Sequence, residues 1–188
     1  VLLDPSYFGQ ACQELVPALV AAGGMTPSEA KAIGRAASER GFDTMARRLG
    51  GDDPIGDIVK AAKADPAKAY RDFSQTSSRY SKENQALAWG VIGQFLAKKL
   101  DPNADDAYRL QQDLGYNELL SVESQEWKVR AGLRAKDWVL VKNAIDGMNP
   151  AVRSKDPAWT YWYGRALKAD GQDAKAKDSF ELIADQYN

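Results

Sequence analysis

The sequence predicts an all-α fold, built as a superhelical array of antiparallel helix pairs. Two observations predict it. Alanine occurs 29 times, against 20 for valine, isoleucine and threonine together, a balance that favours helices over strands. Residues typical of helix starts and ends also recur along the whole chain, while alternating apolar and polar runs joined by hairpin turns are missing.

Each predicted helix begins at a residue suited to a helix N-terminus. Thr26 to Glu29 form a capping box with proline at the first helical position. In it, the side chain of Thr26 can bind the backbone amide of Glu29, and the side chain of Glu29 can bind the backbone amide of Thr26. The other predicted caps are Asp53, Asp65, Asp101 and Asp156, each followed by proline, together with Ser81 and Asp137. The predicted helices are 6–22, 27–40, 42–49, 54–64, 66–80, 82–100, 103–114, 121–135, 137–147, 157–169 and 172–187.

Glycines mark several predicted helix ends, at Gly41, Gly115 and Gly171. We expect one α-superhelical domain over residues 1–188, with a subdivision allowed near 100–120. Because the chain opens at Val1 without a charged or apolar leader, we expect a processed or excised piece of a longer protein.

Residue counts exclude several function classes. The chain has no histidine and one cysteine, Cys12, so it cannot hold a Ser-His-Asp triad, a CxxC motif or an internal disulfide. It carries 25 Lys and Arg against 26 Asp and Glu, and this net charge close to zero argues against nucleic-acid binding. No apolar run approaches the length of a membrane span. We therefore expect no catalytic, cofactor or metal site and no transmembrane segment.

Tryptophan and small residues recur at a spacing typical of helical repeats. Trp127 and Trp159 are 32 residues apart, and Trp89 precedes Trp127 by 38. The last unit follows a tetratricopeptide-like pattern, in which small residues let two helices approach closely. The irregular steps predict a degenerate solenoid of this kind. Its expected structural core contains Trp89, Trp127, Trp138, Trp159, Trp162, Gly164, Gly171, Ala176 and Phe180. A second interpretation makes some of the tryptophans sugar-stacking platforms on a concave face.

Two segments resemble the soluble lytic transglycosylase family. The more specific is Ala158–Leu167, AWTYWYGRAL, continued by Gly171, Ala176 and Phe180–Ala184. The other is Gln125–Arg134, QEWKVRAGLR, followed by Lys136-Asp137-Trp138. The resemblance extends less distinctively over most of the chain.

The resemblance implies a periplasmic or outer-membrane-associated protein of the bacterial envelope. Such enzymes cleave the β-1,4 bond between N-acetylmuramic acid and N-acetylglucosamine and form 1,6-anhydromuramyl ends. The matching region precedes a lysozyme-like domain that carries the catalytic Glu, so the implied partners are glycan strands and that catalytic domain, with other cell-wall proteins as further candidates. Glu123-Ser124 superficially matches the family's Glu-Ser motif, but it directly precedes the predicted Trp127 helix, and we reject it. We therefore expect this chain alone to be an inactive scaffold.

Two other functions remain open from the residues. A stand-alone tetratricopeptide-like adaptor would bind an extended protein segment on its concave face. An enzyme would have to use carboxylates, and the candidates are Glu118, Glu123 and Glu126. A solvated helix face, with an ion pair from Glu126 to Arg130, explains these residues better. The densest basic stretch is Lys128, Arg130, Arg134 and Lys136, which we expect to form a solvated face or, alternatively, to face an anionic stem peptide.

Overall fold

The computed structural model describes residues 10–40, 42–50 and 54–187. These residues form twelve α-helices and two 3-10 helices, and no strand occurs among them, so the all-α prediction is confirmed. The helices are α1 (Gln10–Ala21), α2 (Pro27–Glu39), α3 (Asp43–Gly50), α4 (Gly56–Ala64), α5 (Pro66–Thr76), η1 (Ser77–Arg79), α6 (Lys82–Lys98), α7 (Ala104–Leu114), η2 (Asn117–Leu119), α8 (Val122–Ala135), α9 (Trp138–Asp146), α10 (Pro150–Arg153), α11 (Pro157–Ala169) and α12 (Asp173–Tyr187).

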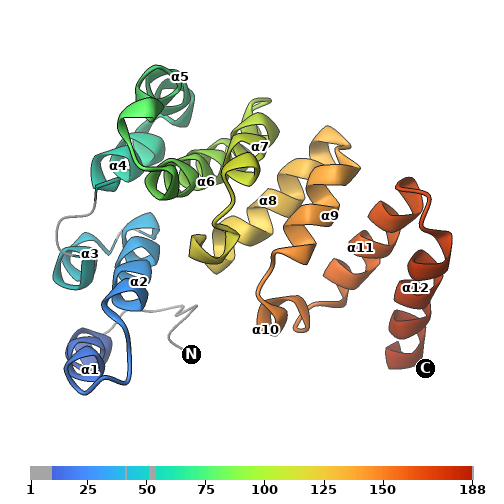
Figure 1. The fold of residues 1–188 in the computed structure, drawn as a ribbon, viewed down its shortest axis with the longest axis horizontal. Helices are drawn as coiled ribbons and strands as arrows, with labels where there is room; N and C mark the ends of the chain where they lie inside the picture. Colours follow the sequence, from blue (N-terminus) through green and yellow to red (C-terminus); the bar gives the residue numbers. More distant parts are fainter. Residues whose placement is uncertain (1–9, 41, 51–53, 188) are drawn as a thin grey trace.

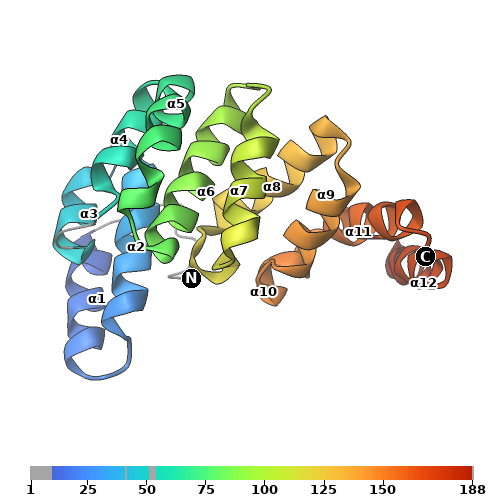
Figure 2. The ribbon, with the colours of Figure 1, turned by 45° about the horizontal axis from the view of Figure 1, so that its top comes forward.

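Consecutive helices pack as neighbours along the chain. The main pairs are α2 with α3, α4 with α5, α6 with α7, α8 with α9, and α11 with α12. In Figures 1 and 2 these pairs follow one another in chain order, from α1 at one end of an elongated molecule to α12 at the other. Short turns join most of the helices, which places sequence neighbours side by side.

Most helix starts lie where the sequence predicts them. Thr26 caps α2, because its Oγ1 accepts a hydrogen bond from the Glu29 amide at 3.2 Å while the Glu29 carboxylate accepts one from the Thr26 amide at 2.7 Å. This reciprocal pair is the predicted capping box. Side-chain caps at four other predicted starts are confirmed as well: Asp65, Ser81, Asp137 and Asp156.

The predicted helix cap at Asp101 is wrong, although the helix itself begins within one residue of the predicted 103. Helix α6 ends at Lys98, Leu100 adopts a φ of 58° in the turn that follows, and α7 begins at Ala104. The Asp101 carboxylate accepts a hydrogen bond from the Asn103 amide at 2.9 Å, so it holds the turn between the two helices. An aspartate before a proline can therefore organise a loop as well as cap a helix.

Other boundaries differ slightly from the prediction. The helix predicted over 66–80 stops at Thr76 and continues as the single 3-10 turn η1. The one-turn helix α10 was not predicted, because four residues are too few to show helical periodicity. The predicted cap at Asp53 and the predicted helix end at Gly41 lie outside the described residues.

The centre of the molecule is packed around α6. Eleven of its 17 residues are buried, because α4, α5, α7 and α8 surround it. The Trp89 ring lies 4.9 Å from that of Phe73 and 5.6 Å from that of Tyr70, measured between centroids. Ala104, Ala107 and Tyr108 belong to the same core, so the 100–120 region is packed into the central cluster. Smaller clusters lie within α1–α3 and within α8, α9 and α11.

Candidate functional site

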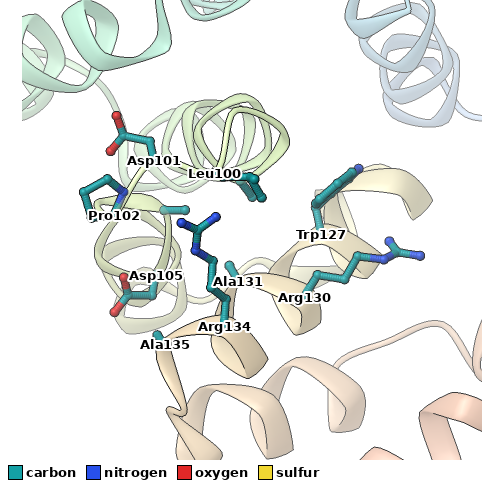
Figure 3. A pocket seen from close by; sticks show the side chains of 11 residues that line it. Leu100, Asp101, Pro102, Asp105, Trp127, Arg130, Ala131, Arg134 and Ala135 are labelled. Carbon is teal, nitrogen blue, oxygen red and sulfur yellow. The ribbon is translucent and has the colours of Figure 1, made fainter.

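A groove lies between the α6–α7 turn and helix α8 (Figure 3). Its volume is about 290 Å³. It is lined by Ala97, Leu100, Asp101, Pro102, Ala104, Asp105, Trp127, Arg130, Ala131, Arg134 and Ala135. The small residues of α8 leave its floor open, and its lining includes one tryptophan, two arginines and two aspartates. This combination can bind a ligand that has both apolar faces and polar or charged substituents.

The cationic side of the groove comes from one face of α8. Trp127, Arg130 and Arg134 are three and four residues apart, so they follow one stripe of the helix. In Figure 3 the Arg134 guanidinium extends toward Leu100 and Pro102, whereas that of Arg130 points the other way, beyond the indole. Arg130 and Arg134 are both exposed and the indole is half-buried, so all three are available to a ligand.

The position of Arg130 is fixed by aromatic rings and one carboxylate. Its guanidinium carbon lies 5.2 Å from the ring centroid of Trp127 and 5.3 Å from that of Trp159 on α11. Its Nη1 lies 3.1 Å from Oε2 of Glu126, so the ion pair predicted between these two residues is confirmed. Arg130 therefore links α8 to α11 at the edge of the groove.

The predicted solvated basic face is wrong for Lys128. This side chain is only 1% exposed, and its Nζ donates hydrogen bonds to Oε1 of Gln111 and Oδ1 of Asn117, each at 2.8 Å. Burial without a carboxylate partner among these contacts lowers its pKa to about 7. Lys128 lies on the face of α8 turned toward α7 and η2, whereas Arg130, Arg134 and Lys136 are exposed.

The predicted core tryptophans fall into two environments. Trp89 and Trp159 are each 4% exposed, whereas Trp127, Trp138 and Trp162 are half-buried. The exposed guanidinium carbon of Arg165 lies 5.9 Å from the Trp138 ring centroid. Trp127, Trp138 and Trp162 thus keep part of their surface accessible.

The other predicted core residues meet in the α11–α12 hairpin. A Cβ added to Gly164 would lie 2.7 Å from the half-buried Phe180 ring, so glycine permits the close approach of the two helices. Ala176 is 2% exposed. Gly171 is exposed and adopts a φ of 74° in the turn between the helices, a conformation that glycine adopts without strain.

The candidate catalytic carboxylates have different surroundings. Glu123 lies 2.7 Å from Lys98 and 3.8 Å from Arg40, measured between charged atoms, and Glu126 pairs with Arg130. Ser124 is buried, and its Oγ donates a hydrogen bond to the carbonyl of Gly90 at 3.1 Å. Glu123-Ser124 therefore takes part in helix packing and ion pairing. Glu118 is exposed and lines a different cavity from the α8 groove.

That second cavity lies between α2, α6 and the chain from η2 into α8. Its volume is about 470 Å³. Glu39 lines it and is 7% exposed, and the Oγ of Ser121 donates to its Oε2 at 2.6 Å. Burial raises the pKa of Glu39 to about 6, and the negative charge of Glu123 contributes to this rise. The hydrogen bond from Ser121 and the positive charges of Lys98 and Arg35 lower the pKa and offset part of the rise.

Sequence reasoning missed Glu39. It follows Arg35 by four residues, a spacing typical of an exposed helical ion pair, so the local pattern suggested a surface position. The carboxylate is buried only in the tertiary structure, where Ser121 and, from α6, Gln94 donate hydrogen bonds to it.

No protein-family model matches the chain, and a search of curated proteins found no match. Within the described ranges, no cluster of three or more Cys, Asp and Glu side chains could hold a metal ion. No helix in this part of the chain is both long and apolar enough to cross a membrane.

Proposed function

We propose that the chain is an accessory α-superhelical domain of a periplasmic peptidoglycan lytic transglycosylase, and that the α8 groove contacts glycan strands. The observation that carries the proposal is the stripe of Trp127, Arg130 and Arg134 beside an open groove. Sugar rings have apolar faces that stack on an indole. The lactyl carboxylate of N-acetylmuramic acid can accept charge-assisted hydrogen bonds from a guanidinium.

The arrangement of the C-terminal hairpins supports a tetratricopeptide-like superhelix. Gly132 of α8 and Gly164 of α11 are 32 residues apart, the same step that separates Trp127 and Trp159. In each hairpin the glycine allows close approach of the second helix: an added Cβ would lie 3.0 Å from Val141 in α9 and 2.7 Å from Phe180 in α12. Stacked pairs of this kind form the extended curved surfaces that suit a long polymer.

A binding measurement tests the proposed role of the groove. Purified glycan strands, freed of stem peptides, should bind the chain, and Arg134→Glu should weaken that binding by about ten-fold, since it replaces an attractive charge by a repulsive one. Arg71→Glu makes the same charge change at an exposed position of α5 and should have little effect. Equal losses in both variants, or no binding by the unmodified chain, would contradict the proposal.

The adaptor function is the alternative, and envelope extracts distinguish it. Retention of purified glycan strands together with no reproducible protein partner in pull-downs would exclude an adaptor. A protein partner that binds the unmodified chain, with no retention of glycan, would instead support it.

The scaffold proposal also predicts an absence of activity. Incubated with purified sacculi, the chain should release no 1,6-anhydromuropeptides, because no catalytic residue is assigned to it. If such products appeared, Glu123→Gln and Glu126→Gln would test the carboxylates: activity unchanged by both substitutions would exclude these two residues as the catalytic acids.

A further inference from the structure

The cavity beside α2 contains charged groups that the glycan groove does not use. It shares no lining residue with the α8 groove. Its apolar wall includes Ile33 of α2 and Leu87 and Val91 of α6, while Arg35 and Glu39 lie on α2 one helical turn apart. A cavity of about 470 Å³ is within the size range of small-molecule sites.

Glu39 presents one carboxylate oxygen that its neighbours do not bind. Ser121 Oγ donates to Oε2 at 2.6 Å, and Gln94, in the amide orientation that satisfies both its ends, donates to the same Oε2 at 3.1 Å. Within the described part of the chain no hydrogen bond reaches Oε1. Because Glu39 lines the cavity, this oxygen is an available acceptor for a ligand.

Arg35 supplies the opposite charge. Its Nε is buried and has no hydrogen-bond partner among the described residues, and its positive charge acts on the nearby Glu39. The nearby Lys98 and Arg40 form ion pairs with Glu123. The charge of Lys98 also acts on Glu39. The cavity thus offers a carboxylate acceptor and a guanidinium donor, side by side, next to an apolar wall.

We propose that this cavity binds a zwitterionic α-amino acid with an apolar side chain. The ligand ammonium pairs with Glu39, its carboxylate pairs with Arg35, and its side chain packs against Ile33, Leu87 and Val91. A fatty acyl chain would make no polar contact with Glu39 or Arg35, and a simple cation would be repelled by Arg35. Only a ligand that carries both charges matches the two groups at once.

A titration with L-leucine and two blocked analogues tests the proposal on the unmodified chain. At about pH 7.5, above the pKa of Glu39, L-leucine should give saturable amide shifts in α2 and residues 118–125 of a ¹H–¹⁵N spectrum. L-Leucinamide lacks the carboxylate and N-acetyl-L-leucine lacks the ammonium. Each should bind at least about ten-fold more weakly, because each loses one charge pair.

Charge-neutralising variants provide the second arm. Glu39→Gln and Arg35→Gln should each weaken leucine binding by about ten-fold or more, whereas Arg71→Gln on α5 should leave it unchanged. The proposal is overturned if L-leucine gives no saturable shifts up to about 10 mM. It is also overturned if both analogues or n-hexanol bind as tightly as leucine, since the cavity would then recognise apolar groups alone. If a variant does not fold, the comparison of the three ligands on the unmodified chain decides the question.

Discussion

The centre of the molecule and its C-terminal hairpin use the same packing device under different constraints. In both, a helical glycine lets an aromatic ring from the next helix approach the backbone. In the centre, an added Cβ at Gly93 would lie 3.0 to 3.1 Å from three atoms of the Tyr108 ring. At the C-terminal end, an added Cβ at Gly164 would lie 2.7 Å from the Phe180 ring.

The two rings differ in their freedom to move. Tyr108 is 0% exposed, and its hydroxyl donates a hydrogen bond to the Ser124 carbonyl at 2.9 Å, so helices pack around it and a polar contact fixes it. Phe180 is half-buried on the last described helix, where α11 is its main neighbour. The shorter distance therefore does not identify the more sensitive site. What matters is whether the contacted ring can shift.

The largest expected effect is at the centre. Gly93→Leu should lower the free energy of unfolding by about 3 kcal/mol or more, because neither Tyr108 nor the surrounding core can make room for the new side chain. Urea denaturation followed by circular dichroism measures the change. Ala61→Leu, on the exposed face of α4, is the control and should change stability by less than about 0.5 kcal/mol. Similar losses in the two variants would argue against tight central packing.

The next effect comes from the buried charge of Lys128. Its pKa is lower in the folded protein, about 7, than the ordinary value of 10.5, so the unfolded chain binds more protons between these values. The free energy of unfolding should therefore rise with pH from about 7 to about 9, by roughly 2 kcal/mol. Lys128→Met should remove that rise.

The exposed Lys155 provides the matched control. Lys155→Met should keep the full pH dependence, measured by urea denaturation at each pH. If Lys128→Met unfolded with the same pH dependence as the unmodified chain, another group would have to be responsible for it.

A smaller effect is expected at the C-terminal hairpin. Gly164→Leu should lower stability by about 1 to 2 kcal/mol, because the half-buried Phe180 ring can move toward solvent and relieve part of the overlap. Hydrogen exchange should accelerate in α11 and α12 more than in α6, since the perturbation lies at one end of the molecule. A neutral result would mean that the two helices do not depend on this close contact.

The smallest effect concerns an exposed ion pair on α12. The charged atoms of Lys177 and Glu181 are 3.4 Å apart, with side chains 74% and 59% exposed, so solvent screens the attraction. Lys177→Ala should change the free energy of unfolding by less than about 0.5 kcal/mol, measured by the same urea titration. A loss above about 1 kcal/mol would show that this face of α12 contributes more than its exposure indicates.

Much of the secondary structure was predictable because its causes are local. The Thr26 capping box and the Asp156 cap each depend on residues only two or three positions apart, which the sequence displays directly. Asp101 was predicted to cap a helix because a proline follows it, but its carboxylate binds the Asn103 amide in the α6–α7 turn, and α7 begins at Ala104, one residue after the predicted start. The arginines of the α8 groove were predicted to be exposed, but the opposite wall, formed by the α6–α7 turn, was not foreseen.

The sequence by itself determined the all-helical class and most of the helix starts, because capping and helix propensity act within a few residues. The tertiary structure alone decided which charges are buried. Lys128 belongs to a basic stretch and Glu39 is spaced for a surface pair with Arg35, yet both are buried by contacts with other elements. Lys128 is buried by α7 and η2, and Glu39 by the turn at Ser121. Desolvation depends on what packs against a side chain, and a local sequence pattern does not contain that information.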